Sequence, residues 1–140
     1  MDWKLKGNKH FQRQELEKAI GCYLIGIEST TESDSDTLRA LHSNRANCYY
    51  ELGNYSQALL DSSECISLMK KKNDIKLEQK NKMRMAKCHW CLHQLEDALQ
   101  IIQDTEWETN YVKIANKLTR SIQDTKHDSK YVPIHAKIAL

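Results

Sequence analysis

The stretch that decides the fold reads His42-Ser-Asn-Arg-Ala-Asn-Cys-Tyr-Tyr50 and continues as Tyr55-Ser-Gln-Ala-Leu-Leu60. It places a small residue, Ala46, among bulky ones, and a second small residue, Ala58, twelve positions later. Two antiparallel helices approach closely only where their side chains are small, so such a pair marks a helix crossing. Gly53-Asn54 supplies the turn, since glycine accepts a left-handed backbone conformation. The stretch therefore predicts a pair of antiparallel helices.

Two further segments of the chain repeat this arrangement. They run from Trp3 to Phe11 and Glu15 to Tyr23, and from Lys82 to Trp90 and Gln94 to Leu99. Their small residues, again twelve positions apart, are Gly7 with Ala19 and Ala86 with Ala98. Successive segments are offset by 39 and 40 residues. A self-similar period of this length predicts an array of stacked helix pairs.

The composition agrees with an all-α domain. The 140 residues are 40% hydrophobic and 29% charged, with one proline and four glycines. This is the mixture of one packed globular domain, and long helices with short turns need few turn residues. The net charge of +2 gives no overall field that would favour nucleic acid or a membrane surface. No apolar run approaches the roughly 18 residues that a membrane-spanning helix needs.

The repeats predict six helices, at about residues 2–13, 15–28, 37–52, 55–70, 75–92 and 95–104. Polar residues 29–36 are expected to form a loop, whereas residues 70–79 contain no glycine or proline and are expected to extend a helix. A seventh helix at about 110–124 would cap the bare end of the stack. Its apolar stripe consists of Tyr111, Ile114, Leu118 and Ile122.

These elements define a domain at residues 1–124. Its repeats are expected at about 2–28, 37–70 and 75–105, followed by the capping helix at about 110–124. Residues 125–140, which include Pro133, are expected to form an irregular tail.

The five cysteines fall on apolar positions of the helical pattern. Buried free thiols in a reducing compartment explain them, and the N-terminus shows no export signal, so the cytoplasm or the nucleus is the expected location. Cys88-His-Trp-Cys91 has a CxxC spacing, but no second pair completes a four-ligand zinc site. His89 and His93 are the histidine pair at ligand spacing, with His93 expected in an exposed turn. No metal ion and no cofactor is predicted.

Motifs that would support catalysis are absent from the sequence. It contains no glycine-rich phosphate loop, no Gly-x-Ser-x-Gly elbow and no zinc-protease helix. We therefore expect a binding module and not an enzyme.

The repeated order of bulky residue, small residue, aromatic residue and then alanine in the second helix resembles the tetratricopeptide-repeat (TPR) pattern. The resemblance covers about residues 2–105 and implies an α-solenoid of three stacked TPR helix pairs with a capping helix. Two features depart from the pattern: the proline that usually closes a repeat is missing, and the steps exceed the common value of about 34 residues. In such a stack the first helix of each pair lines the concave side.

Five polar residues share one face of the three predicted first helices, in a band about a third of a turn wide. They are Lys4, Asn8, Asn44, Lys80 and Arg84. The expected groove thus carries three cations, two amides and no acid. A lysine on a helix face is by itself usually only a solvated residue, but an asparagine inside a helix, such as Asn44, is unfavourable without a partner.

The same five residues match the Lys-x-x-x-Asn, Asn, Lys-x-x-x-Arg pattern of TPR domains with a two-carboxylate clamp. The resemblance implies a cytosolic co-chaperone module that holds the C-terminal Glu-Glu-Val-Asp tail of the seventy- or ninety-kilodalton heat-shock chaperones. A chain ending in aspartate carries two carboxylates within one residue, which ammonium, guanidinium and amide donors suit. Asn47 and Tyr50 replace the small apolar residues often found nearby in that family, so the sequence does not choose between the two chaperones.

Two alternative functions remain open. In the first, the chain is a TPR scaffold that binds an unrelated peptide segment and does not use the clamp. In the second, it is the chaperone-docking domain of a larger enzyme. Three further residues, Lys82, Lys87 and His89, either enrich the groove or are solvated, and His89 has packing as another possible role.

Overall fold

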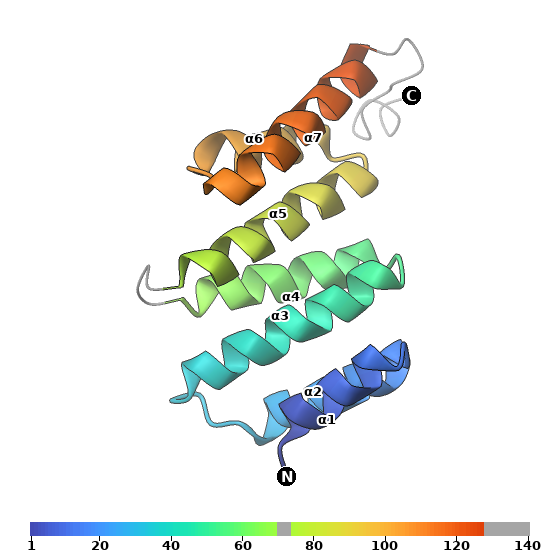
Figure 1. Cartoon of the computed structure of the whole chain (residues 1–140), viewed down its shortest axis with the longest axis vertical. Coiled ribbons are helices and arrows are strands. Elements are labelled where there is room, and N and C mark those ends of the chain that lie inside the picture. Colours follow the sequence, from blue (N-terminus) through green and yellow to red (C-terminus); the bar gives the residue numbers. More distant parts are fainter. Residues whose placement is uncertain (70–73, 128–140) are drawn as a thin grey trace, which may run out of the picture.

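The computed structural model describes residues 1–69 and 74–127, and in these ranges the chain forms seven α-helices and no strand. The helices are α1 (Trp3–Gln12), α2 (Leu16–Ser29), α3 (Ser35–Glu51), α4 (Tyr55–Ser67), α5 (Ile75–Cys91), α6 (Leu95–Asp104) and α7 (Thr109–His127). Three antiparallel pairs, α1–α2, α3–α4 and α5–α6, stack along the long axis, with α7 at the far end (Figure 1). The predicted all-α solenoid is confirmed.

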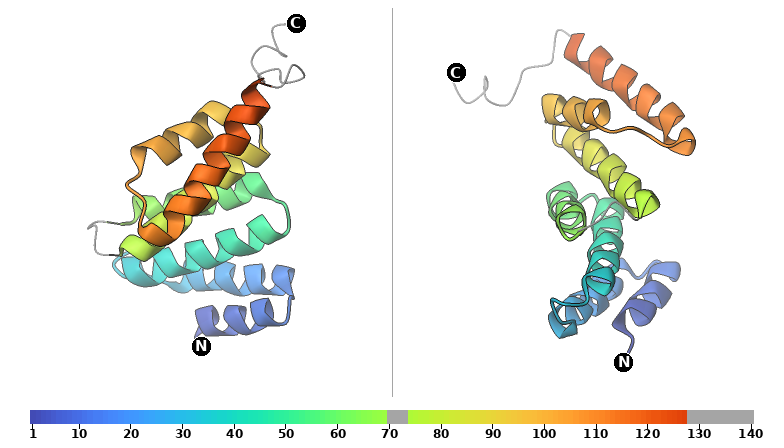
Figure 2. Two further views of the ribbon diagram at one scale, coloured as in Figure 1. Left: turned by 45° about the horizontal axis from the view of Figure 1, so that its top comes forward. Right: turned by 90° about the vertical axis from the view of Figure 1, so that its left-hand side faces the viewer.

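The stack has two layers (Figure 2, right). The first helix of each pair and α7 form one layer, in which α1 contacts α3, α3 contacts α5 and α5 contacts α7. The second helices, α2, α4 and α6, form the other layer. The layer of α1, α3, α5 and α7 faces the viewer in Figure 1, and its side chains are the ones on which the predicted site depends.

Each first helix begins at an aspartate N-cap. The Oδ1 atoms of Asp2, Asp34 and Asp74 accept hydrogen bonds from the main-chain N–H three residues later, at 3.0, 3.2 and 3.0 Å. Such a cap satisfies a free N–H group, and its charge complements the helix dipole. Because of the cap at Asp34, α3 begins at Ser35, two residues earlier than predicted.

The two helices of each pair are joined by the same turn. One residue in each turn is left-handed: Gln14 at φ 60°, Gly53 at φ 78° and His93 at φ 59°. The next N–H then bonds back five residues, from Glu15 to His10, Asn54 to Tyr49 and Gln94 to His89, at 2.9, 2.8 and 2.8 Å. This closure satisfies the last carbonyls of the first helix. The predicted turn at Gly53 and the predicted position of His93 are both confirmed.

Small residues mark the helix crossings as predicted. Ala19, Ala46, Ala58, Ala86 and Ala98 are all 0% exposed. At Gly7 the contact is tighter still, because a Cβ atom there would lie 2.4 Å from Cε1 of Tyr23. The ring of Tyr23 therefore fits between α1 and α2 only because residue 7 has no side chain.

The end of the second repeat differs from the prediction. Helix α4 ends at Ser67, not near residue 70, and a new helix begins at Ile75 behind its own N-cap. The expected helix over residues 70–79 is confirmed for Ile75–Gln79, while residues 70–73 lie outside the described residues.

The seventh helix caps the stack, but with a different apolar stripe. Its buried residues are Ala115, Leu118 and Ile122, which join the core of α5 and α6, whereas Ile114 is 41% exposed. The prediction that Ile114 belongs to the buried stripe was wrong, because the smaller Ala115, one residue later, makes the close contact with the core of α5 and α6. The helix also continues to His127, so residues 125–127 are not irregular; residues 128–140, including Pro133, lie outside the described residues.

None of the helices in the described ranges combines the length and the apolar character needed to cross a bilayer.

Candidate functional site

The predicted residues Asn8 and Asn44 meet where α1 packs against α3. Nδ2 of Asn44 donates a hydrogen bond of 3.2 Å to Oδ1 of Asn8. The same oxygen accepts a second bond, of 2.5 Å, from the hydroxyl of Tyr23 on α2. Residues separated by 36 positions in the sequence are thus joined directly, and the two amides form one polar unit at the α1–α3 junction.

Lys4 lies one helical turn before Asn8 on α1 and is exposed. Residues four apart on a helix share one face, so its ammonium group projects from the same side of α1 as the Asn8 amide. A shallow hollow beside Lys4 is also lined by Trp3 and by Thr37 of α3. Lys4 therefore stands at the N-terminal edge of the candidate site.

Arg84 is held much more deeply than the sequence suggests. It is 7% exposed, and its Nη1 atom donates to Asn81 Oδ1 at 2.8 Å, to the Ser43 carbonyl at 3.2 Å and to Ser62 Oγ at 3.5 Å. Arg84 therefore takes part in the packing of α5 against α3 and α4, which its position on the helix face does not reveal. Burial is the main cause that lowers its pKa, but arginine remains protonated at any ordinary pH.

Asn81, which is fully buried, connects this arginine to the rest of the fold. Its Nδ2 atom donates to Leu77 O at 2.9 Å, to Ser43 Oγ at 3.1 Å and to Cys65 Sγ at 3.4 Å. A buried polar group without partners is costly, so the bonds from α5 to α3 and α4 fix both Asn81 and Arg84 in one arrangement.

Lys80 lies one turn before Arg84 on α5, at the exposed rim of the same cluster. Its pKa is lowered, first by partial removal from water and then by the positive charge of Arg84. The shift has the sign expected of two cations held near each other. An anion between them would relieve their repulsion.

In the part of the chain that the structure describes, none of Lys4, Lys80 and Arg84 has a carboxylate within the 4.0 Å that defines an ion pair. Other cations on these helices are divided: Arg45 pairs with Asp61 and Lys82 with Glu78, both at 2.8 Å, whereas Lys6, Lys9, Lys76 and Lys87 also have no such partner in the described residues. The cations of the candidate site are thus left for an anion from outside these residues.

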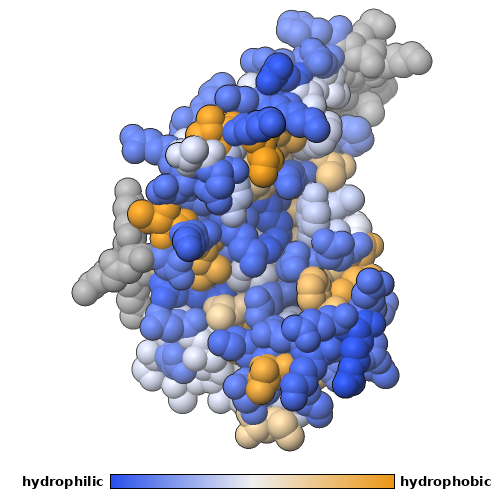
Figure 3. Space-filling model, viewed as in Figure 1, coloured by the Kyte–Doolittle hydropathy of each residue, from blue (hydrophilic) through white to orange (hydrophobic). Residues whose placement is uncertain are grey.

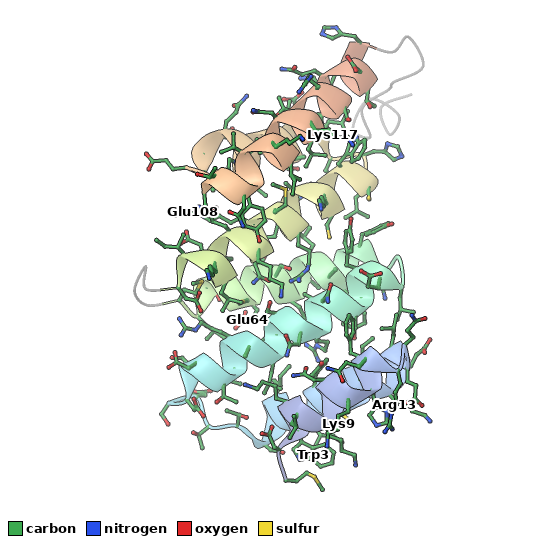
Figure 4. All side chains as sticks on the ribbon, in the orientation of Figure 1. Trp3, Lys9, Arg13, Glu64, Glu108 and Lys117 are labelled. Atoms are coloured by element: carbon green, nitrogen blue, oxygen red, sulfur yellow. The ribbon has the colours of Figure 1, made fainter. Side chains whose placement is uncertain are left out.

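Two hollows flank the cluster on this face, which is mostly hydrophilic with separate apolar patches (Figure 3). A hollow of about 770 Å³ lies between the starts of α5 and α7, with Lys80 at its edge. Its rim also carries Asp74 and Glu108, the latter at the start of α7 (Figure 4), so the expectation of a groove without acids is wrong at this end.

The second hollow, of about 230 Å³, is an apolar slot between α3, α5 and α7. It is lined by Tyr50, Lys87, Trp90, Cys91, Ile114, Lys117, Leu118 and Ser121. Exposed Ile114, misplaced by the sequence pattern, is explained here as a wall of the slot. Tyr50, noted as a departure from the clamp family, is the α3 wall and packs edge-on against Tyr55 at 5.6 Å.

The further residues considered from sequence separate clearly. Lys82 is paired with Glu78, and His89 Nδ1 lies 2.7 Å from Gln94 Oε1 across the turn, so both take part in local structure. Lys87 lines the apolar slot. Asn47 is half-buried and does not line either hollow.

The cysteine and histidine spacings do not produce a metal site in the described residues. Cys88 is buried and Cys91 exposed, and no group of three or more His, Cys, Asp or Glu side chains in these ranges could hold an ion. The two cysteines differ in depth because Cys91 is the last residue of α5 and lies at its exposed end, whereas Cys88 lies inside the packed part of the helix.

Sequence reasoning missed the residues behind the site. The sequence does not single out Tyr23, Ser43 or Asn81 as functional residues. Asn81 offered one signal: it is an asparagine in mid-helix, which is unfavourable without a partner, as was argued for Asn44. Nothing local in the sequence identifies the Ser43 carbonyl as an acceptor for Arg84.

Three helix pairs that cross at small residues, closed by a helix over the third pair, are the architecture of a tetratricopeptide-repeat solenoid. The solved structure of the first TPR of Spaghetti (RPAP3) bound to the HSP90 peptide SRMEEVD shares this fold with a TM-score of 0.70 and 24% identity. The likeness covers 90% of this chain and 94% of that chain. The TPR fold is thereby established.

Sequence relatives match part of the chain. A segment of 65 residues is 37% identical to protein unc-45 homolog B of Danio rerio and covers 46% of this chain and 7% of that protein. A segment of 67 residues is 33% identical to heat shock protein STI1 of Saccharomyces cerevisiae and covers 48% of this chain and 11% of that protein. The matches thus span a small fraction of each relative's length. No protein-family model matches the chain.

Proposed function

We propose that this TPR domain binds the acidic C-terminal tail, ending in Glu-Glu-Val-Asp, of a cytosolic heat-shock chaperone. The observation that carries the proposal is the cation pair Lys80 and Arg84, which lacks a carboxylate partner in the described residues and lies on the same layer as the joined amides Asn8 and Asn44. The neighbour in fold that is bound to an HSP90 peptide ending in Glu-Glu-Val-Asp supports the same ligand class.

The chemistry of the five residues fits the two carboxylates of a terminal aspartate. Lys4 and Lys80 supply ammonium groups, Arg84 a guanidinium, and Asn8 with Asn44 supply neutral amide donors. Charge-assisted hydrogen bonds contribute about 1.5–3 kcal/mol each, but ordering the extended peptide opposes binding. The expected dissociation constant is therefore modest, about micromolar.

The apolar slot gives the ligand a second contact. In this proposal a peptide whose terminal aspartate lies at Lys80 and Arg84 runs along α5 toward Trp90 of the slot, about 1.7 turns after Arg84. Methionine, the residue before Glu-Glu-Val-Asp in the HSP90 peptide of the structural neighbour, is flexible and suits a small apolar slot. The ninety-kilodalton chaperone is therefore the preferred ligand of the proposal, with the seventy-kilodalton chaperone as the second candidate.

The test is fluorescence anisotropy of the full chain with a labelled Met-Glu-Glu-Val-Asp peptide, as free acid and as C-terminal amide. The free acid should bind saturably, and the amide should bind far more weakly because it has lost one carboxylate. Added salt should weaken binding, since the cations are partly exposed. Equal affinity of the two peptides would contradict the proposal and favour a scaffold for an unrelated segment.

A matched pair of lysine variants locates the site. Lys80→Ala should lower the affinity for the free-acid peptide by roughly tenfold, which corresponds to the loss of one exposed charge-assisted hydrogen bond. Lys9→Ala, on the same layer but outside the predicted band (Figure 4), should leave affinity unchanged. If both variants lost affinity equally, the attraction would be general electrostatics and not a clamp.

The proposed role is binding and not catalysis, and the proposed location is the cytoplasm or the nucleus. Since the matched relatives are much longer than this chain, a further domain of the parent protein would decide whether the module serves a co-chaperone or docks a larger enzyme.

A further inference from the structure

The hydrogen bonds at Asn8 define which end of its amide faces outward. Two donors converge on Oδ1, the Tyr23 hydroxyl at 2.5 Å and Asn44 Nδ2 at 3.2 Å. An amide oxygen has two lone pairs, so these bonds use its full accepting capacity. The Nδ2 group of Asn8 is consequently left as the donor for a ligand.

The orientation matters because an ionised carboxylate only accepts hydrogen bonds. An asparagine side chain presents a donor or an acceptor after half a rotation of its last torsion angle, and that rotation is intrinsically soft. If Asn8 presented its oxygen, it would repel the ligand that Lys4 and Lys80 attract.

Tyr23 is built to maintain this orientation. Its side chain is 1% exposed, and its ring passes beside Gly7, where any Cβ atom would clash. Burial raises the pKa of Tyr23, so its hydroxyl keeps its proton and remains a donor. The ring comes from α2, in the layer behind the site, so its hydroxyl approaches Asn8 from the protein side.

We propose that Tyr23 is a positioning residue of the peptide site, whose buried hydroxyl fixes the Asn8 amide with its NH₂ group toward the ligand carboxylate. This inference rests on the proposed function and adds to it a residue that does not touch the peptide. Asn44 takes part through the same oxygen, which couples α1 to α3.

The experiment measures the affinity of the free-acid Met-Glu-Glu-Val-Asp peptide for the full chain and for its Tyr23→Phe, Asn8→Ala and double variants. Tyr23→Phe removes one oxygen atom and should weaken binding by roughly three- to tenfold, the range of one neutral hydrogen bond. In the Asn8→Ala background the same change should have no further effect. A purely structural role of the hydroxyl would instead reduce affinity equally in both backgrounds, and that result would overturn the proposal.

A matched control is Tyr49→Phe, because Tyr49 is a half-buried α3 tyrosine whose ring lies near Arg45, away from the amides. Its affinity should equal that of the wild type. Unchanged affinity of Tyr23→Phe, with Asn8→Ala impaired, would also overturn the proposal.

A second measurement separates this inference from the proposed function. In ¹H–¹⁵N spectra of the peptide-free chain, Tyr23→Phe should shift the Asn8 and Asn44 side-chain NH₂ signals, while Tyr49→Phe should not. If the wild type failed to bind the free-acid peptide, the proposed function would be wrong, whereas the amide orientation would still be decided by these signals. Unshifted Asn8 signals would disprove it.

Discussion

Arg84 and Asn81 lie one turn apart on α5, and both are buried. Nη1 of Arg84 donates a hydrogen bond of 2.8 Å to Oδ1 of Asn81. The arginine proposed to bind a ligand is thus also part of the packing between α3, α4 and α5. One nitrogen of the guanidinium is committed to the fold, which holds the group in place before a ligand arrives. Preorganisation of this kind reduces the ordering cost of binding.

Replacing Asn81 should therefore affect both stability and binding. Asn81→Ala removes donors to Ser43 and Leu77 and leaves Arg84 without one acceptor, so the free energy of unfolding should fall by about 2–3 kcal/mol. Urea denaturation measures this change, and Asn116→Ala on the exposed face of α7 is the control. Equal stability of the two variants would show that the buried bonds do not hold the arginine.

Two glycines should respond oppositely to alanine. Gly7→Ala places a Cβ atom 2.4 Å from the Tyr23 ring and should lower the free energy of unfolding by about 1–3 kcal/mol, the range for overpacking. Gly21→Ala meets nothing within 4 Å and should be neutral or stabilising by up to about 1 kcal/mol, since alanine favours helix. Thermal unfolding of both variants tests the pair, and a shift of the same sign and size in each would contradict the packing argument.

The buried carboxylate of Asp61 should make stability depend on acid pH. Burial opposes its ionisation, but hydrogen bonds from His42 at 3.1 Å and from Arg45 at 2.8 Å outweigh this effect and lower its pKa. A lowered folded-state pKa stabilises the fold above the unfolded value of about 4, and this contribution is lost as pH falls through the folded value. Thermal unfolding between pH 7 and pH 3 should show this loss.

The matched variants for this prediction are Asp61→Asn and Asp124→Asn. Asp61→Asn should destabilise the protein at pH 7 and flatten the acid dependence, because position 61 then has no carboxylate to be protonated. Asp124→Asn changes an exposed residue near the end of α7 and should keep the pH dependence of stability seen in the wild type. An unchanged slope in Asp61→Asn would assign the acid sensitivity to other groups.

The thiols should differ sharply in reactivity. Cys22, Cys48, Cys65 and Cys88 are buried, and burial raises the pKa of Cys88 to about 12. Cys91 is exposed at the end of α5, beside the apolar slot. Because the thiolate is the reactive form, native protein should take up one maleimide per chain by mass spectrometry, and Cys91→Ser should take up none. Several rapid additions would show that the core opens readily.

The sequence by itself determined the helical hairpins, their number and the residues at their crossings. Small residues twelve positions apart, as Ala46 with Ala58, are a local pattern whose meaning follows from helix geometry alone. The turn at Gly53 is likewise local, since glycine favours the left-handed backbone found there. The same left-handed conformation occurs at Gln14, but residues with a side chain rarely adopt it, so the sequence does not predict it there.

Tertiary structure decided which side chains of the candidate site are free and which are held. Lys4 and Lys80 are exposed as their helical positions predict, but the depth of Arg84 depends on a carbonyl 41 residues away on α3. The sequence pattern places Asn8 and Asn44 on equivalent faces of two different helices, yet the orientation of the Asn8 amide depends on Tyr23 from the layer behind them. Periodicity reports the direction of a side chain from its own helix, whereas hydrogen-bond partners depend on how the helices pack against one another.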